Sequence, residues 1–201
     1  RYAEFQYETK SVIEILDKSQ DSEMSLPTAM TIFNRSMINL SNEKGVLSSY
    51  RLHKENVVSN NFNIRYFSEG TIKVSEDNRD EWFNNYSLNF KIETDSVTRK
   101  RLYKFRFYDT YFFIDSYDQF DTLINSYRFD DTYTTDGINH DLPFEFSLYD
   151  KLSQISETTK ILLIEPVEQT ATRFMNLIEI KETSVDSDQL ELSILYANPN
   201  I

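Results

Sequence analysis

The feature that most constrains this fold is a change in the spacing of apolar residues near Asn60. Before Asn60, apolar residues recur at three- and four-residue steps. After it, they alternate with polar residues, most clearly in YSLNFKIE (86–93) and RLYKFRF (101–107). The first spacing marks one buried face of a helix, and the second marks a strand with one face in water. The sequence therefore predicts an α+β fold in which a helical N-terminal portion packs on a mostly antiparallel β-sheet.

The predicted helical portion is a subdomain over residues 1–58. It contains three expected helices, at residues 2–18, 28–40 and 43–58. Pro27 suits the first turn of the second helix, whereas Gly45 and the pair Ser48 and Ser49 lower the helix propensity of the third.

Residues 60–201 are predicted to form an antiparallel-sheet subdomain with two inserted helices. Strands are expected at residues 64–66, 72–74, 86–92, 103–107, 111–114, 161–164, 174–181 and 190–196. The inserted helices are expected at residues 117–125, with Ser116 as the cap and Asp118 in the first turn, and at residues 147–155. The polar run 183–188 predicts a hairpin loop between the last two strands.

Composition excludes several chemistries. The 201 residues contain no cysteine and three glycines, which removes disulfides, thiol nucleophiles, iron–sulfur clusters and glycine-rich phosphate loops. His53 and His140 lack the spacing of a zinc site, and no GxSxG elbow is present. We therefore expect a non-enzymatic domain with no cofactor and no metal. A pH-responsive histidine and an unrecognised pair of catalytic carboxylates remain the alternatives.

The charge distribution argues against a nucleic-acid partner, because the net charge is −12. Residues 109–150 carry ten acids against Arg128 alone. The segment fails the EF-hand pattern, since Asp136 stands where that loop needs glycine, so a solvated acidic surface is favoured over a calcium site. The bases of the run 99–106 interleave with aromatics, as in a nucleic-acid-binding strand or a half-buried strand. A third interpretation pairs these bases with the acidic segment that follows.

Aromatic residues concentrate in one part of the chain, with fifteen of the twenty-nine between Tyr103 and Tyr149. Most must form core, but tyrosine is amphipathic and is frequent at binding surfaces. The sequence therefore suggests a ligand cleft lined by tyrosines. The candidates are Tyr103, Tyr111, Tyr117, Tyr127 and Tyr133.

In overall character the chain resembles the periplasmic sensor domain of bacterial two-component histidine kinases, in particular the cell-wall-stress kinases of vibrios. The resemblance lies in the beginning RYAEFQYETKSVIEIL, the strands YSLNFKIE and RLYKFRFYDTYFFID, and the lack of cysteine. It implies a homodimeric domain on the periplasmic side of the inner membrane, held between two membrane spans that the 201 residues do not include. An unknown small molecule or protein would be the stimulus, and the kinase would be the output.

Two features of the chain bear on this expectation. No stretch has the length of a membrane span, and the chain starts at Arg1, so we expect a segment from which any anchor has been removed. In the sensor hypothesis both ends lie at one pole, and a ligand acts by shifting the first helix on the sheet. The alternatives are a secreted or surface-anchored binding module and an enzyme of unrecognised type.

Overall fold

The structure is a computed structural model that describes residues 6–15, 40–70, 72–79, 82, 86–130, 141–148, 159–184 and 189–196. Contacts divide the chain into two units. Unit 1 combines residues 1–53 with 172–199, and unit 2 comprises residues 54–171 with 200–201. The sequence predicts subdomains over residues 1–58 and 60–201. Both units are built mainly from β-strands.

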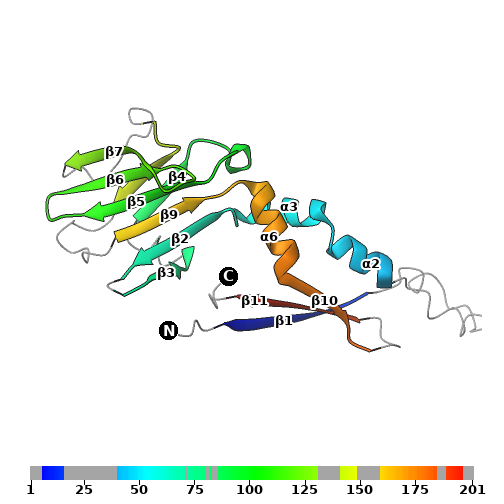
Figure 1. Cartoon of the computed structure of the whole chain (residues 1–201). Coiled ribbons are helices and arrows are strands. Elements are labelled where there is room, and N and C mark those ends of the chain that lie inside the picture. Colours follow the sequence, from blue (N-terminus) through cyan, green and yellow to red (C-terminus); the bar gives the residue numbers. More distant parts are fainter. Residues whose placement is uncertain are drawn as a thin grey trace, which may run out of the picture. The chain divides into compact units, whose positions relative to one another are not determined.

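Unit 2 contains a six-stranded antiparallel sheet (Figure 1). Its order across the sheet is β3-β2-β9-β5-β6-β7. The strands are β2 (Ile64–Glu69), β3 (Val74–Asp77), β5 (Arg101–Phe107), β6 (Tyr111–Tyr117), β7 (Leu123–Asp130) and β9 (Thr159–Ile164). Every neighbouring pair is antiparallel, which confirms that part of the sequence prediction.

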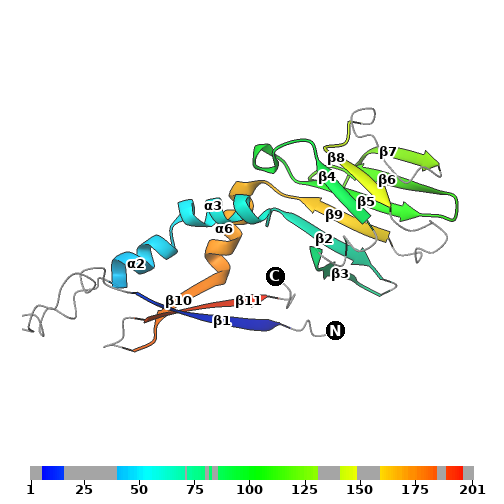
Figure 2. The same ribbon diagram turned by 180° about the vertical axis from the view of Figure 1, so that it is seen from behind.

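A second, two-stranded sheet covers one face of the large sheet. It pairs β4 (Tyr86–Phe90) with β8 (Phe144–Leu148), and Figure 2 shows both strands lying across β5 and β6. Ring contacts join the two layers: Phe105 lies 4.8 Å from Phe146 between ring centroids, and Tyr103 lies 5.0 Å from Phe144. The core between the layers is therefore aromatic, as expected from composition.

Strand β5 shows how the sequence specifies this core. Tyr103, Phe105 and Phe107 are buried, whereas Lys104 and Arg106 are only partly buried. Successive side chains of a strand point to opposite faces, so the alternating sequence puts every ring of β5 toward β8. The predicted half-buried strand is confirmed.

Unit 1 contains a three-stranded antiparallel sheet with the order β1-β11-β10. Its strands are β1 (Tyr7–Glu14), β10 (Ile178–Glu182) and β11 (Gln189–Tyr196). Helix α2 (Leu40–Leu47) also belongs to unit 1. Helices α3 (Tyr50–Asn60) and α6 (Val167–Leu177) contain the points along the chain where one unit gives way to the other.

The predicted helical N-terminal portion is wrong. Residues 7–14, expected within a helix, form strand β1, which pairs with β11 along its whole length. Thr9, Val12 and Ile13 are β-branched and favour strands, and their partner lies far along the sequence, where local spacing carries no information. Residues 40–60 are helical, with a break at Ser48 and Ser49. The helix expected at residues 28–40 lies almost wholly outside the described residues.

The first inserted helix is also wrong. Residues 117–125 contain the end of β6, a tight turn and the start of β7. Asp118 Oδ1 accepts hydrogen bonds from the backbone N–H groups of Phe120 at 2.8 Å and Thr122 at 2.9 Å. Aspartate can cap a helix or close a turn with the same carboxylate, so its presence after Ser116 did not distinguish the two.

Two further elements differ from the prediction. Ser147, the expected start of the second inserted helix, lies in β8, and residues 149–155 lie outside the described part of the chain. The strand expected at residues 174–181 begins as the last turn of α6 and becomes β10 only at Ile178. The strands expected at residues 161–164 and 190–196 are confirmed as β9 and β11, and β10 and β11 pair as the predicted hairpin.

Candidate functional site

The tyrosines suggested as a ligand cleft lie on two faces of the large sheet. Tyr103 and Tyr127 share the face that packs on β4 and β8. Tyr111 and Tyr117 lie on the opposite, outer face, because along β6 they keep the step opposite to that of Phe112 and Ile114, which belong to the core. Tyr133 lies outside the described residues. Tyr103 and Tyr127 are thus close enough to interact on the inner face, whereas Tyr111 and Tyr117 share the outer face but stand at opposite ends of β6.

A buried carboxylate organises the outer face. Asp115 on β6 is 2% exposed. Its Oδ2 accepts a hydrogen bond from Arg106 Nε at 2.7 Å, and its Oδ1 accepts a short hydrogen bond from Ser126 Oγ. The hydrogen bond to Asp115 raises the pKa of Arg106 above its ordinary value. These contacts connect strands β5, β6 and β7 through one side chain.

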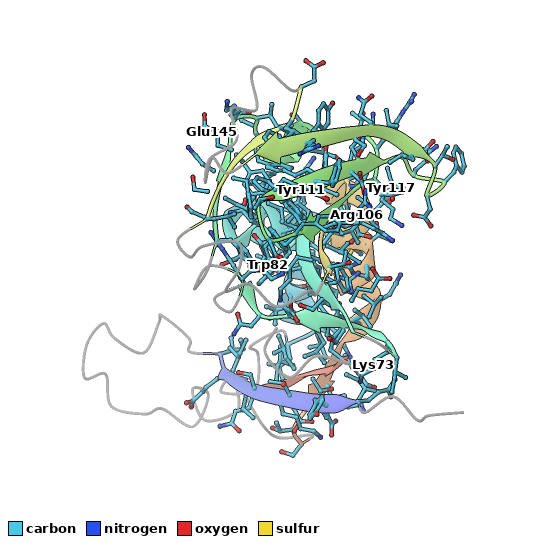
Figure 3. All side chains as sticks on the ribbon, turned by 90° about the vertical axis from the view of Figure 1, so that its left-hand side faces the viewer. Lys73, Trp82, Arg106, Tyr111, Tyr117 and Glu145 are labelled. Carbon is cyan, nitrogen blue, oxygen red and sulfur yellow. The ribbon has the colours of Figure 1, made fainter. Side chains whose placement is uncertain are left out.

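The other bases of the outer face lie over aromatic rings. Arg128 lies 4.4 Å from the ring centroid of Tyr111, and Lys104 Nζ lies 5.5 Å from that of Tyr117. Arg106, already paired with Asp115, also lies over Phe113. Figure 3 labels Arg106, Tyr111 and Tyr117 on this sheet and Trp82 in the core. These basic side chains therefore make cation–π contacts with rings of the same face.

Acidic residues of segment 109–150 pair with bases of the neighbouring strands and loops. Besides the contact of Asp115 with Arg106, Lys100 lies 3.9 Å from Asp121. Lys91 lies 2.9 Å from Glu145. The pairs of Arg106 and Lys100 match the third interpretation of the sequence, in which the basic run pairs with the acidic segment, for two bases of that run.

A cavity of about 490 Å³ lies at the end of the sandwich where β4 ends and β8 begins. Its apolar lining includes Val97, Tyr103 and Ile164. Its charged lining consists of Arg99, Arg101 and Asp141. The volume is in the range of small-molecule sites.

Local sequence positions the loop that forms one wall of this cavity. The loop includes a short 3-10 helix, η3 (Thr94–Ser96). Asn63, fully buried, donates from Nδ2 to the carbonyl oxygens of Thr94 at 3.1 Å and Glu165 at 3.2 Å. Lys91 N donates to the carbonyl oxygen of Pro143 at 2.9 Å, which joins the end of β4 to the start of β8. The wall is therefore fixed by backbone and amide hydrogen bonds to both sheets.

Tyr103 connects the predicted site to the observed cavity. Burial raises the pKa of Tyr103 to about 12, and the nearby Arg101 opposes that shift. The phenol is therefore neutral at physiological pH. Among the described candidate tyrosines, Tyr103 is the one that lines the cavity.

Sequence reasoning missed Arg99, Arg101 and Asp141 as residues of one site. The sequence marks the run 99–101 as basic, and none of the three interpretations given above places these side chains in a ligand site. A signal was present, because Arg101 keeps the two-residue step of Tyr103 and Phe105 and so shares their face. Asp141 carried no local signal.

The histidines and acids form no metal cluster in the part of the chain that the structure covers. His53 is buried in α3, and burial lowers its pKa below the ordinary value. His140 lies outside that part. Among the described residues, no group of three or more His, Asp or Glu side chains is arranged to hold a metal ion.

Within the described residues, none of the helices has the length and apolar character that a bilayer crossing requires. No protein-family model and no curated protein matches the sequence.

Proposed function

We propose that this chain is the extracytoplasmic sensor domain of a membrane-bound bacterial histidine kinase, on the periplasmic side of the inner membrane. The observation that carries the proposal is the pairing of β1 with β11, from Tyr7 opposite Tyr196 to Glu14 opposite Gln189. Because the strands are antiparallel, the chain enters β1 beside the point where it leaves β11 (Figure 1). A domain inserted between two spans of one bilayer needs this arrangement of its ends.

The paired strands also favour one signalling mechanism. The sensor hypothesis expects a first helix that shifts on the sheet. Residues 7–14 instead form a strand, which is hydrogen-bonded to β11 along its whole length. Moving the two ends apart would break that ladder, whereas moving them together leaves it intact. The signal therefore passes between two copies in a homodimer, and a ligand acts by preferring one arrangement of the two copies.

A binding role is supported over a catalytic one by the chemistry of the side chains. The sequence lacks thiols, glycine-rich phosphate loops and a nucleophile elbow. The described cavity offers arginines, one carboxylate and a neutral phenol around an apolar wall. Such a set recognises a ligand without supplying an activated nucleophile.

The first test determines the full gene sequence and the membrane topology of the encoded protein. We expect a hydrophobic span on each side of the segment, followed by a kinase region. Reporter enzymes that are active only outside the cytoplasm should be active when fused within the domain and inactive beyond either span. A single span on one side would replace the proposal with a surface-anchored binding module, and no span would replace it with a secreted one.

The second test locks the two ends together. Thr9 and Ile194 are direct partners in the ladder, so cysteines at both positions are close enough for a disulfide. The 201 residues contain no cysteine of their own, and any cysteine of the flanking regions is replaced by serine for this test. In the full receptor, Thr9→Cys with Ile194→Cys should cross-link within one chain and leave the response intact, and Thr9→Cys alone should form no such bond. Loss of response on oxidation, restored by reduction, would show that the ends must separate.

A further inference from the structure

The two arginines of the cavity, Arg99 and Arg101, differ in their ion pairs from two other arginines of unit 2. Arg65 and Arg106 each hold a carboxylate at 2.7 Å. In contrast, no described carboxylate lies within salt-bridge distance of Arg99 or Arg101. Arg99 is exposed and Arg101 is half-buried at the cavity. The charge of Arg101 helps to lower the pKa of Asp118, but no described carboxylate forms an ion pair with either guanidinium group.

The charge of the lining favours an anion. Arg99 and Arg101 contribute two positive charges and Asp141 one negative charge, which leaves a positive site on a chain whose net charge is −12. Guanidinium groups bind carboxylates and phosphates through paired hydrogen bonds. The cavity also has an apolar wall of Val97, Tyr103 and Ile164, which suits a ligand with an apolar part.

We propose that this cavity binds a small organic oxyanion, either a carboxylate or a phosphate monoester. Arg99 and Arg101 hold its charged group, and Val97, Tyr103 and Ile164 contact its apolar body. Asp141 limits the affinity, because its carboxylate repels the ligand. As the input of a receptor, this ligand class rests on the function proposed above, whereas binding itself does not.

The test titrates the isolated chain with three probes and follows amide chemical shifts by NMR. Benzoate and phenyl phosphate carry the two proposed anionic groups on the same ring, and benzyl alcohol is their neutral counterpart. We expect either anion to bind at least about tenfold more tightly than benzyl alcohol, the gain expected from a charged hydrogen bond. The anion that binds more tightly identifies the class. Equal binding of benzyl alcohol, or no binding of either anion, would overturn the proposal.

Four variants assign the binding to named residues. Arg99→Gln and Arg101→Gln should each weaken the preferred anion about tenfold. Lys73→Gln removes the same charge from an exposed lysine outside the cavity and should leave affinity unchanged. Asp141→Asn should tighten binding about threefold, and asparagine suits the positive φ of 55° at this position.

Variant outcomes also separate this proposal from the receptor function. Wild-type affinity in Arg99→Gln and Arg101→Gln, or equal weakening by Lys73→Gln, would refute the assigned site even if the anions bind. The measurement needs neither membrane nor kinase. Failure of anion binding would therefore leave the two-span topology standing, and a single span would leave an observed anion site standing.

Discussion

Strand β5 of unit 2 and strand β1 of unit 1 differ in how much of their side chains is buried. In β5 of unit 2, alternate side chains are buried between two sheets. In β1 of unit 1, seven of the eight residues are exposed and only Ile13 is partly buried. Both strands are hydrogen-bonded along a partner, but only β5 is also fixed by packing. The β-structure of unit 2 is thus specified by its core, and β1 is specified mainly by its ladder with β11.

The largest expected effect tests the core of unit 2. Phe105 is fully buried and contacts Trp82, Phe144 and Phe146. Phe105→Ala leaves a cavity among these rings and should lower the free energy of unfolding by about 3–5 kcal/mol. Urea unfolding followed by the fluorescence of Trp82, the single tryptophan, measures this loss in unit 2.

The matched change in unit 1 is Val12→Ala in β1. Val12 is 55% exposed, so the substitution should change stability by no more than about 0.5 kcal/mol. Hydrogen exchange of the β1 amides is the suitable readout. A loss comparable to that of Phe105→Ala would show that β1 depends on packing as strongly as β5 does.

The same contrast explains what the sequence could predict. Alternation in residues 101–107 predicted β5 because burial between two layers selects the residue type at every second position. Exposed β1 carries no such selection, and its partner lies more than 170 positions away. Asp118 was ambiguous, because a carboxylate after Ser116 suits a helix start and a turn equally well.

The candidate site was predictable only in part. Tyr103 was named because aromatics concentrate around it, and it does line the cavity. The remaining wall comes from the loop after β4 and from Asp141, and loops are positioned by contacts such as those of Asn63 that leave no periodic pattern. A site made by the convergence of loops needs the fold before it can be recognised.

For each residue, a smaller effect than that of Phe105→Ala is expected from alkaline pH, and it acts on unit 2. Burial raises the pKa values of Tyr66, Tyr86 and Tyr103 to about 12. The unfolded chain loses these protons near pH 10, whereas the folded chain retains them until about pH 12, so stability falls as pH rises between these values. Each tyrosine accounts for about 2–3 kcal/mol of this loss. Tyr86→Phe should reduce the slope of stability against pH above 10; an unchanged slope would show that Tyr86 titrates normally.

Breaking one ion pair in each unit should have a still smaller effect on stability, and the two losses can be compared. Asp115 in unit 2 is 2% exposed and accepts hydrogen bonds from Arg106 and Ser126. Asp115→Asn should cost about 1–3 kcal/mol, because it removes a charged acceptor from a buried position. Glu191→Gln in unit 1 removes the partly exposed partner of the exposed Lys10 and should hardly change stability. Equal costs in urea unfolding would contradict the difference between the units.

The smallest effect is expected at acidic pH, at the point where unit 1 gives way to unit 2. His53 is the last residue assigned to the first part of unit 1, and its burial lowers its pKa below the ordinary 6.5. As pH falls through 6.5, the unfolded chain binds a proton that the folded chain still resists, so stability declines until pH reaches the lowered folded value. His53→Leu removes this group and should flatten stability against pH just below 6.5. If the variant keeps the same slope, the acid sensitivity comes from other groups, and α3 is not the element through which pH acts.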